Sequence, residues 1–312
     1  MSTTNGTATD YLDLMAQFNA WVTGLGGGAA WTALRSSSTE YIWQTAGSGG
    51  SPADPAIVGA KSFFNVGADY YNWRLSGFTA FDSSLAFELQ SGFIGAGGNN
   101  CPIFTCWNAS IPYRFYATGR RAIILAKIST VYVVAYLGYL STYVSPGSYP
   151  YPLVIGGNMA WEGAEPAASS ATWRWSYNGV QMGNFPIPTT PSSLAEGSQL
   201  RMRRSDGVWM GFGKAPLLSN SAPNIGKVWP YGNWGTIATP DMRTNLDGGY
   251  ILLPIVLQDV APNNYGELDG IFAVSGFSNS AENTVTIGGV AHYVVPNVFR
   301  TTQVDFFAIK EA

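Results

Sequence analysis

The chain has 312 residues, and 16 Lys and Arg residues against 19 Asp and Glu residues leave a net charge of −3 at pH 7. Without a surplus of cations there is no electrostatic footprint for a nucleic-acid backbone, which excludes nucleic-acid binding as the main task. Only 11% of the residues are charged and 14% are aromatic, which excludes a disordered polymer and is typical of the neutral surfaces at the centre of protein interfaces.

The N-terminal region predicts a flexible tail followed by the clearest helix of the chain. Residues 1–9 are polar and contain no apolar segment of the kind that directs secretion, so we expect a protein made in the cytosol. Tyr11–Thr23 carries apolar residues at helical spacing, and Asp10 is a suitable N-cap. The glycines at 26–28 follow this helix and lack a Gly-Lys-Ser/Thr sequence, which excludes a phosphate-binding loop.

Strand patterns begin after this helix. We expect strands at 39–45, 56–64, 69–81 and 111–117, with a Gly/Ser/Pro-rich loop at 46–55. The last of these strands is expected to pair, across Thr118-Gly119, with the apolar run that follows it.

Residues 122–140 form the longest apolar run, long enough to raise the question of a membrane span. Lys127 lies within it, and the run is rich in Ile, Val, Thr and Tyr, which favour strands. We therefore predict one long central strand, or two strands bent near Ser129-Thr130, apolar on both faces and covered on both. No membrane partner is expected.

The second half begins with a segment, 161–199, that resembles a long loop or an extended arm. Strands are predicted at 200–212, 250–258, 271–274, 284–287, 290–295 and 304–309, whereas 220–234 reads as a loop. Pro254 predicts an edge or a bulge in its strand. Gly288-Gly289 predicts a tight hairpin turn.

These patterns predict a mainly β fold: an antiparallel β-sandwich or barrel-like structure with one N-terminal α-helix and long loops. We expect residues 10–312 to form one large β-rich domain. The alternative is two lobes, 10–160 and 200–312, joined by the loop or arm at 161–199.

The chain has two cysteines and one histidine. Cys101 and Cys106 are interpreted either as reduced thiols in a loop or as a loop-closing disulfide. A metal site is not expected, because His292 is far away in the sequence and no second cysteine pair exists. No G-x-S-x-G motif accompanies His292, so it is interpreted as structural and no cofactor is predicted.

Acidic residues gather in the segment YGELDG, where Glu267 and Asp269 fall on one side of an extended chain. Asp241, Asp247 and Asp259 are nearby in the sequence. Such acids could cleave a glycosidic bond or hold a calcium ion. We favour the third interpretation, in which they cap backbone amides and pair with arginines.

Two aromatic clusters are candidates for contact with a partner or for stacking on a sugar. The first comprises Tyr70, Tyr71 and Trp73, with Phe78 and Phe81 close by. The second comprises Trp229, Tyr231 and Trp234. Alternation along the strand predicts that about half of the first cluster belongs to the core.

Four segments resemble a family of virion structural proteins of tailed bacteriophages. They are GADYYNWRLSGF (67–78), AKISTVYVVAYLGY (126–139), SYPYPLVIGG (148–157) and the stretch from YGELDGIFAVSGF to AENTVTIGGVAHYVVPNVFRT (265–301). The resemblance spans most of the chain and is weakest at 161–225. No catalytic residue comes with it.

The resemblance implies a tail or baseplate component that is not an enzyme. Its partners would be copies of itself in a ring and other virion proteins, and it would be assembled in the host cytoplasm. Head or collar decoration is the alternative position. The alternative functions are a receptor- or glycan-binding module on the particle surface, and a polysaccharide hydrolase that uses Glu267 and Asp269.

Overall fold

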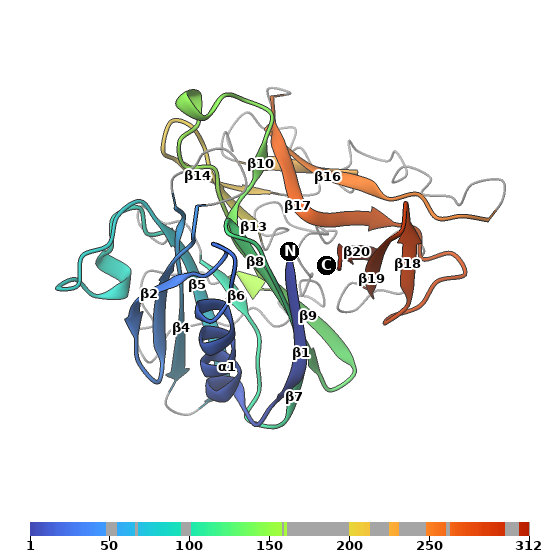
Figure 1. Cartoon of the computed structure of the whole chain (residues 1–312). Coiled ribbons are helices and arrows are strands. Elements are labelled where there is room, and N and C mark those ends of the chain that lie inside the picture. The colour runs from blue at the N-terminus through green and yellow to red at the C-terminus, as the bar shows by residue number, and fades with distance from the viewer. Residues whose placement is uncertain are drawn as a thin grey trace.

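The computed structural model describes residues 1–47, 55–65, 68–94, 101–157, 159–160, 200–212, 225–230, 248–259, 263–296 and 306–311. In these residues the fold is mainly β, with two sheets and one α-helix, α1 (Tyr11–Thr23) (Figure 1). The predicted fold class is therefore confirmed.

The smaller sheet is antiparallel and has the strand order β12-β6-β5-β4-β3-β2. Its strands are β2 (Thr32–Ser36), β3 (Glu40–Gln44), β4 (Ile57–Asn65), β5 (Ala68–Phe78), β6 (Pro102–Phe104) and β12 (Met159–Ala160). The expected strands at 39–45, 56–64 and 69–81 correspond to β3, β4 and β5.

The larger sheet has 14 strands and curves into a half-barrel (Figure 1). Its path is β1-β7-β8-β9-β11-β13-β14-β15-β16-β17-β20-β19-β18, and β10 pairs with β17. Neighbouring strands are antiparallel, except that β14 and β15 are parallel. The strands are β1 (Ser2–Ala8), β7 (Ile111–Ala117), β8 (Arg121–Ile128), β9 (Val131–Tyr139), β10 (Ser141–Thr142), β11 (Leu153–Gly156), β13 (Leu200–Arg203), β14 (Trp209–Phe212), β15 (Ile225–Trp229), β16 (Leu253–Gln258), β17 (Asn264–Val274), β18 (Thr284–Ile287), β19 (Val290–Pro296) and β20 (Phe306–Lys310).

The long apolar run forms the hairpin β8–β9, which turns at Ser129 (φ 57°). Of the two alternatives, two strands are therefore correct. Side chains alternate between two hydrophobic cores: Ile124 and Val133 belong to the core shared with the smaller sheet, and Ile123 and Val134 to the core inside the half-barrel. This division explains why the run is apolar on both faces. None of the described helices is long and apolar enough to cross a bilayer.

Helix α1 closes the space between the two sheets. Asp10 Oδ1 accepts hydrogen bonds from the backbone N–H groups of Leu12 and Asp13, both at 2.8 Å, which confirms the predicted N-cap. The ring of Phe18 makes edge contacts with Trp43 of the smaller sheet and Phe115 of the larger one, each at 5.2 Å between centroids. One apolar side chain thus fastens the helix to both sheets.

Two sequence-based expectations were wrong. Residues 1–9 are not a loose tail, because Ser2–Ala8 forms β1 and pairs along its whole length with β7. Three threonines favour this strand, and its pairing satisfies the backbone groups of β7. Part of the expected loop at 220–234 forms β15, which joins β14 to β16.

Other local predictions are confirmed. Gly288 and Gly289 turn between β18 and β19 with φ of 58° and 78°, the left-handed values that this tight turn requires. The register of β16 against β17 shifts just after Pro254, where a bulge was expected. One continuous sheet runs through both proposed lobes, although each has its own core, and the segment 161–199 lies outside the described residues.

Candidate functional site

The acidic pair predicted from the sequence lies on one face of β17, where Glu267 and Asp269 flank the buried Leu268. Asp269 Oδ2 accepts a hydrogen bond from Arg121 Nε at 2.9 Å. Glu267 Oε2 accepts one from the Tyr143 hydroxyl at 3.2 Å. The arginine partner expected for these acids is therefore present for Asp269.

Arg121 is a buried cation, with 1% of its side chain exposed, whereas Asp269 is 43% exposed. Its guanidinium lies against Gly270 (φ 75°), where a Cβ atom would come within 2.2 Å of Arg121 Nη2. The ion pair joins β8 to β17 across the half-barrel, so Asp269 has a structural task. In the described part of the chain, no group of three or more His, Cys, Asp or Glu side chains could hold a metal ion.

Of the other acids near in the sequence, only Asp259 lies in the described part of the chain, and it is engaged elsewhere. Asp259 accepts hydrogen bonds from the backbone and side-chain nitrogens of Asn263, at 3.0 and 2.8 Å. Asp241 and Asp247 lie outside the described residues. An ion site at Glu267 and Asp269 thus gains no further ligand from the described structure.

Part of the first aromatic cluster, Trp73 and Phe78, belongs to the core. Trp73 is fully buried, its indole N–H donates to the carbonyl of Tyr11 at 3.1 Å, and its ring packs 5.1 Å from that of Phe104. Tyr71 is half-buried, with its ring 4.9 Å from that of Tyr11. Trp73 is therefore unavailable to a partner, which corrects its selection as a contact residue. The side chain of Tyr70 is outside the described structure.

The second aromatic cluster is described only at Trp229. This residue ends β15 and is 37% exposed, so it is accessible to a partner. Tyr231 and Trp234 lie outside the described residues, and their clustering stays a prediction.

Cys101 and Cys106 are reduced and buried, one on either side of β6, and no disulfide joins them. Burial raises the pKa of the Cys106 thiol well above its ordinary value, because an apolar surrounding disfavours the thiolate. A buried thiol of this kind is chemically inert. Of the two interpretations, the structure corresponds to reduced thiols and not to a loop-closing disulfide.

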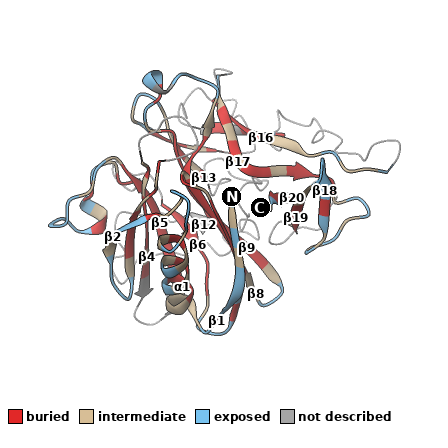
Figure 2. Cartoon of the chain, viewed as in Figure 1, coloured by how far each residue is buried: buried red, intermediate tan, exposed pale blue. Residues whose placement is uncertain are grey.

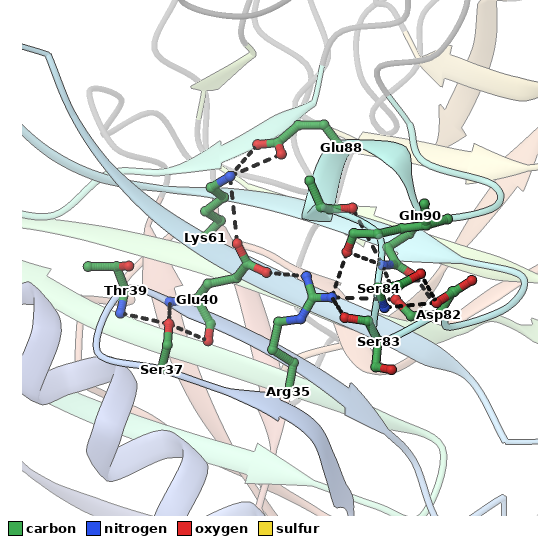
Figure 3. A network of polar contacts seen from close by, with 12 residues as sticks. Arg35, Ser37, Thr39, Glu40, Lys61, Asp82, Ser83, Ser84, Glu88 and Gln90 are labelled. Carbon is green, nitrogen blue, oxygen red and sulfur yellow. Dashed lines mark hydrogen bonds and ion pairs between the residues drawn. The ribbon is translucent and has the colours of Figure 1, made fainter.

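A charged network that the sequence had not singled out ties the smaller sheet to the loop that follows β5 (Figure 3). Glu40 Oε1 accepts from Arg35 at 2.6 Å, and Glu40 Oε2 lies 3.6 Å from Lys61 Nζ. Glu88 Oε1 accepts from Lys61 at 2.7 Å and from the nearly buried Arg74 at 2.9 Å. Glu88 lies in the short helix η1 (Phe87–Leu89), so the network fixes this helix on β4 and β5.

The backbone of the 82–90 loop is fixed as well. Arg35 Nη2 donates to the carbonyls of Leu85 and Ser83, at 2.6 and 3.3 Å. Gln90 is buried, and its amide group donates to the carbonyl of Asp82 at 2.7 Å and accepts from the Asp82 N–H at 2.8 Å. The two ends of the loop are thereby joined to each other.

Three apolar side chains alternate along this loop. Phe87 points inward, is fully buried, and meets the ring of Phe78 edge-on at 5.2 Å. Gly59 leaves room for it, since a Cβ there would lie 2.8 Å from the Phe87 ring. Leu85 and Leu89 point the other way and are 36% and 67% exposed. The loop lies at the left of Figure 1, and Figure 2 shows its exposed outer side.

This loop could not be located from its own sequence. The stretch DSSLAFEL contains a turn signal and a Leu-x-Phe-x-Leu alternation, which predicts one buried and one exposed side. Its fixing partners Arg35, Glu40 and Lys61 come from three earlier strands, and a linear pattern does not reveal that they meet.

Comparison of the sequence with known family models and with curated proteins finds no match. The functional assignment therefore depends on the chain's own residues.

The single histidine gives a pH prediction. His292 is 5% exposed and packs edge-on against Phe272, and this burial lowers its pKa below the ordinary value. As the pH falls, the unfolded chain binds the proton before the folded chain does. The free energy of unfolding therefore begins to fall near the unfolded-state pKa of about 6.5 and stops falling below the folded-state pKa, which is lower.

We expect this slope to be missing in His292→Gln, whatever the variant's overall stability. Urea unfolding at several pH values between about 7.5 and 5.5 measures this slope. Lower pH values are avoided because carboxylates titrate there as well. An equal slope in both proteins would show that His292 does not set it.

The ion pair gives a second prediction. Asp269→Asn leaves Arg121 buried without its carboxylate, and we expect the free energy of unfolding to fall by about 2–3 kcal/mol. This is less than for a fully buried pair, because Asp269 is 43% exposed.

The matched control is Glu267→Gln, two residues away on the same face, which should cost no more than about 0.5 kcal/mol. Denaturant unfolding compares the two. Equal losses would refute the structural role of Asp269.

Proposed function

We propose that the chain is a structural subunit of a tailed-bacteriophage virion: a tail or baseplate component that assembles with copies of itself and with neighbouring virion proteins. The resemblance of its segments to that family supports the particle, and the 82–90 loop supports assembly. The observation that carries the proposal is a firmly held loop that presents two leucines to solvent.

Charged side chains are few in this chain, and several of them gather at this loop. Charged residues are only 11% of the chain, yet Arg35, Glu40, Lys61, Arg74 and Glu88 meet behind this one loop. Fixing an exposed loop costs conformational entropy, which this network of partly buried ion pairs offsets in the free protein. A loop fixed before binding loses less entropy when a partner docks, so this arrangement favours association.

The exposed side chains are of the kind that drive such association. Leu85 and Leu89 lie on either side of the buried Phe87 in the sequence, and both are exposed to solvent. Burying apolar side chains at the centre of a contact stabilises it, and a polar rim surrounds that centre. Here the surrounding polar groups include Asp82, Ser83 and Ser84, all exposed.

The edge strand β1 is a second feature suited to an assembly. It pairs with β7 on one side, and no strand among the described residues pairs with its other side. Thr3, Asn5 and Thr7 are exposed along it, and it contains none of the charges or prolines that usually protect an edge from pairing. Contacts between different surfaces of successive copies close into rings when the rotation permits.

The assembly prediction concerns Leu89. We expect the wild-type protein to form an oligomer of defined copy number as its concentration rises, and Leu89→Asp to need about tenfold more protein or more for the same oligomer. A carboxylate at this position would be buried unpaired in the contact. Light scattering at several concentrations measures the mass.

The matched control is Thr286→Asp, which adds the same charge at an exposed position of β18, outside the proposed contact, and should assemble like the wild type. A wild-type monomer at every concentration would contradict self-assembly. An oligomer unaffected by Leu89→Asp would move the contact away from this loop.

A further inference from the structure

A pocket of about 220 Å³ opens between the first strands of the larger sheet and β19. Its polar and aromatic lining includes Asn5, Arg114, Lys127, Tyr132, Glu282 and Tyr293. None of these residues was singled out as a candidate site from the sequence. The strands that form its walls are held in place by the half-barrel core, so the pocket is built on a firm frame.

The charged groups of the pocket are arranged in two pairs. Glu282 Oε1 accepts hydrogen bonds from Lys127 Nζ at 2.7 Å and from the Tyr132 hydroxyl at 2.5 Å. Arg114 Nη1 lies 3.1 Å from Glu311 Oε1, and its guanidinium stacks 4.0 Å from the centroid of the Tyr293 ring. Glu311 is not part of the lining, but each cation of the pocket has one carboxylate partner: Glu282 for Lys127 and Glu311 for Arg114.

Glu282 is held in a backbone conformation that is unfavourable for it. Its φ is 67°, in the left-handed region that glycine adopts without penalty. The side chains of Lys127 and Glu282 are 37% and 47% exposed, so their ion pair contributes little to stability. The Glu282 N–H donates to the Val294 carbonyl at 3.0 Å, so the turn is fixed on β19 and holds the carboxylate at the pocket.

The charge pattern selects the class of ligand. An anion would meet the carboxylate of Glu282, and a cation would meet Arg114 and Lys127, while Glu311 already offsets the charge of Arg114. A hydroxyl group both donates and accepts, so a polyol can bond to the carboxylate and the ammonium together. The volume is below the roughly 300 Å³ of pockets for drug-sized ligands, which fits one sugar ring.

We propose that this pocket binds a neutral sugar, one pyranose unit of a glycan, through hydrogen bonds to Lys127, Glu282 and Arg114. Glu282 Oε2 accepts from a sugar hydroxyl, while Oε1 keeps Lys127 and Tyr132 in place. Arg114, which lies over the Tyr293 ring, donates a guanidinium N–H to a second hydroxyl. This is a binding activity in addition to assembly, and it does not depend on the 82–90 loop.

The test uses ligand-observed NMR on the full chain, with glucose, galactose, mannose and N-acetylglucosamine as separate probes. We expect saturable binding of at least one, with a dissociation constant on the order of 1 mM, which is reasonable for a ligand of this size. Glucuronate and glucosamine carry one charge each and should bind more weakly. No saturable binding by any neutral sugar, or equal binding by the charged ones, would overturn the proposal.

Two variants locate the site. Glu282→Gly removes the carboxylate and relieves the strained backbone, so it should weaken binding about tenfold or more without lowering the thermal midpoint. Lys127→Met keeps the apolar stem and removes the ammonium, with the same loss of binding expected.

The control is Arg204→Met, which removes another surface ion pair, with Asp206, far from the pocket in the sequence. It should bind like the wild type. Unchanged binding in both pocket variants would place the sugar elsewhere, and a lower thermal midpoint with unchanged binding in Glu282→Gly would make that residue structural.

Discussion

The structure depends on one constraint: the hairpin β8–β9 is apolar on both faces, and both faces must be covered. Strands are amphipathic when one face meets water, but here Ile123 and Ile124 enter different cores. The smaller sheet and α1 cover one face, and the strands from β13 onward curve round to cover the other (Figure 1). The half-barrel therefore buries the second apolar face of the hairpin β8–β9.

Polar interactions then fix positions that apolar burial leaves undetermined. The Arg121–Asp269 pair sets how β17 lies against β8, and the network around Glu40 and Glu88 sets the 82–90 loop. Burying Arg121 has a desolvation cost that a single carboxylate repays only in part, so the pair is better understood as a source of specific geometry than of stability. Polar contacts of the same kind position the 82–90 loop and the pocket, the two surfaces for which we propose binding.

Local features were predictable from the sequence, whereas contacts between residues far apart in the sequence were not. The N-cap at Asp10, the turn at Gly288-Gly289 and the bulge after Pro254 each follow from one residue's backbone chemistry. The edge strand Ser2–Ala8 was missed because its polar residues gain their order from pairing with β7, over a hundred positions away. Trp73 was wrongly chosen because composition does not tell an exposed aromatic from a buried one, and the pocket was missed because Arg114, Lys127 and Glu282 converge only in the folded chain.

The most direct test of the central claim is quantitative mass spectrometry of purified particles. Tailed particles released by cells that encode the chain would be banded in a density gradient, and its peptides counted against those of the other particle proteins. A structural subunit predicts a fixed whole number of copies per particle that withstands washing in high salt, because an apolar contact is not screened. Particles that band without the chain, or lose it on washing, would contradict its role as a virion component.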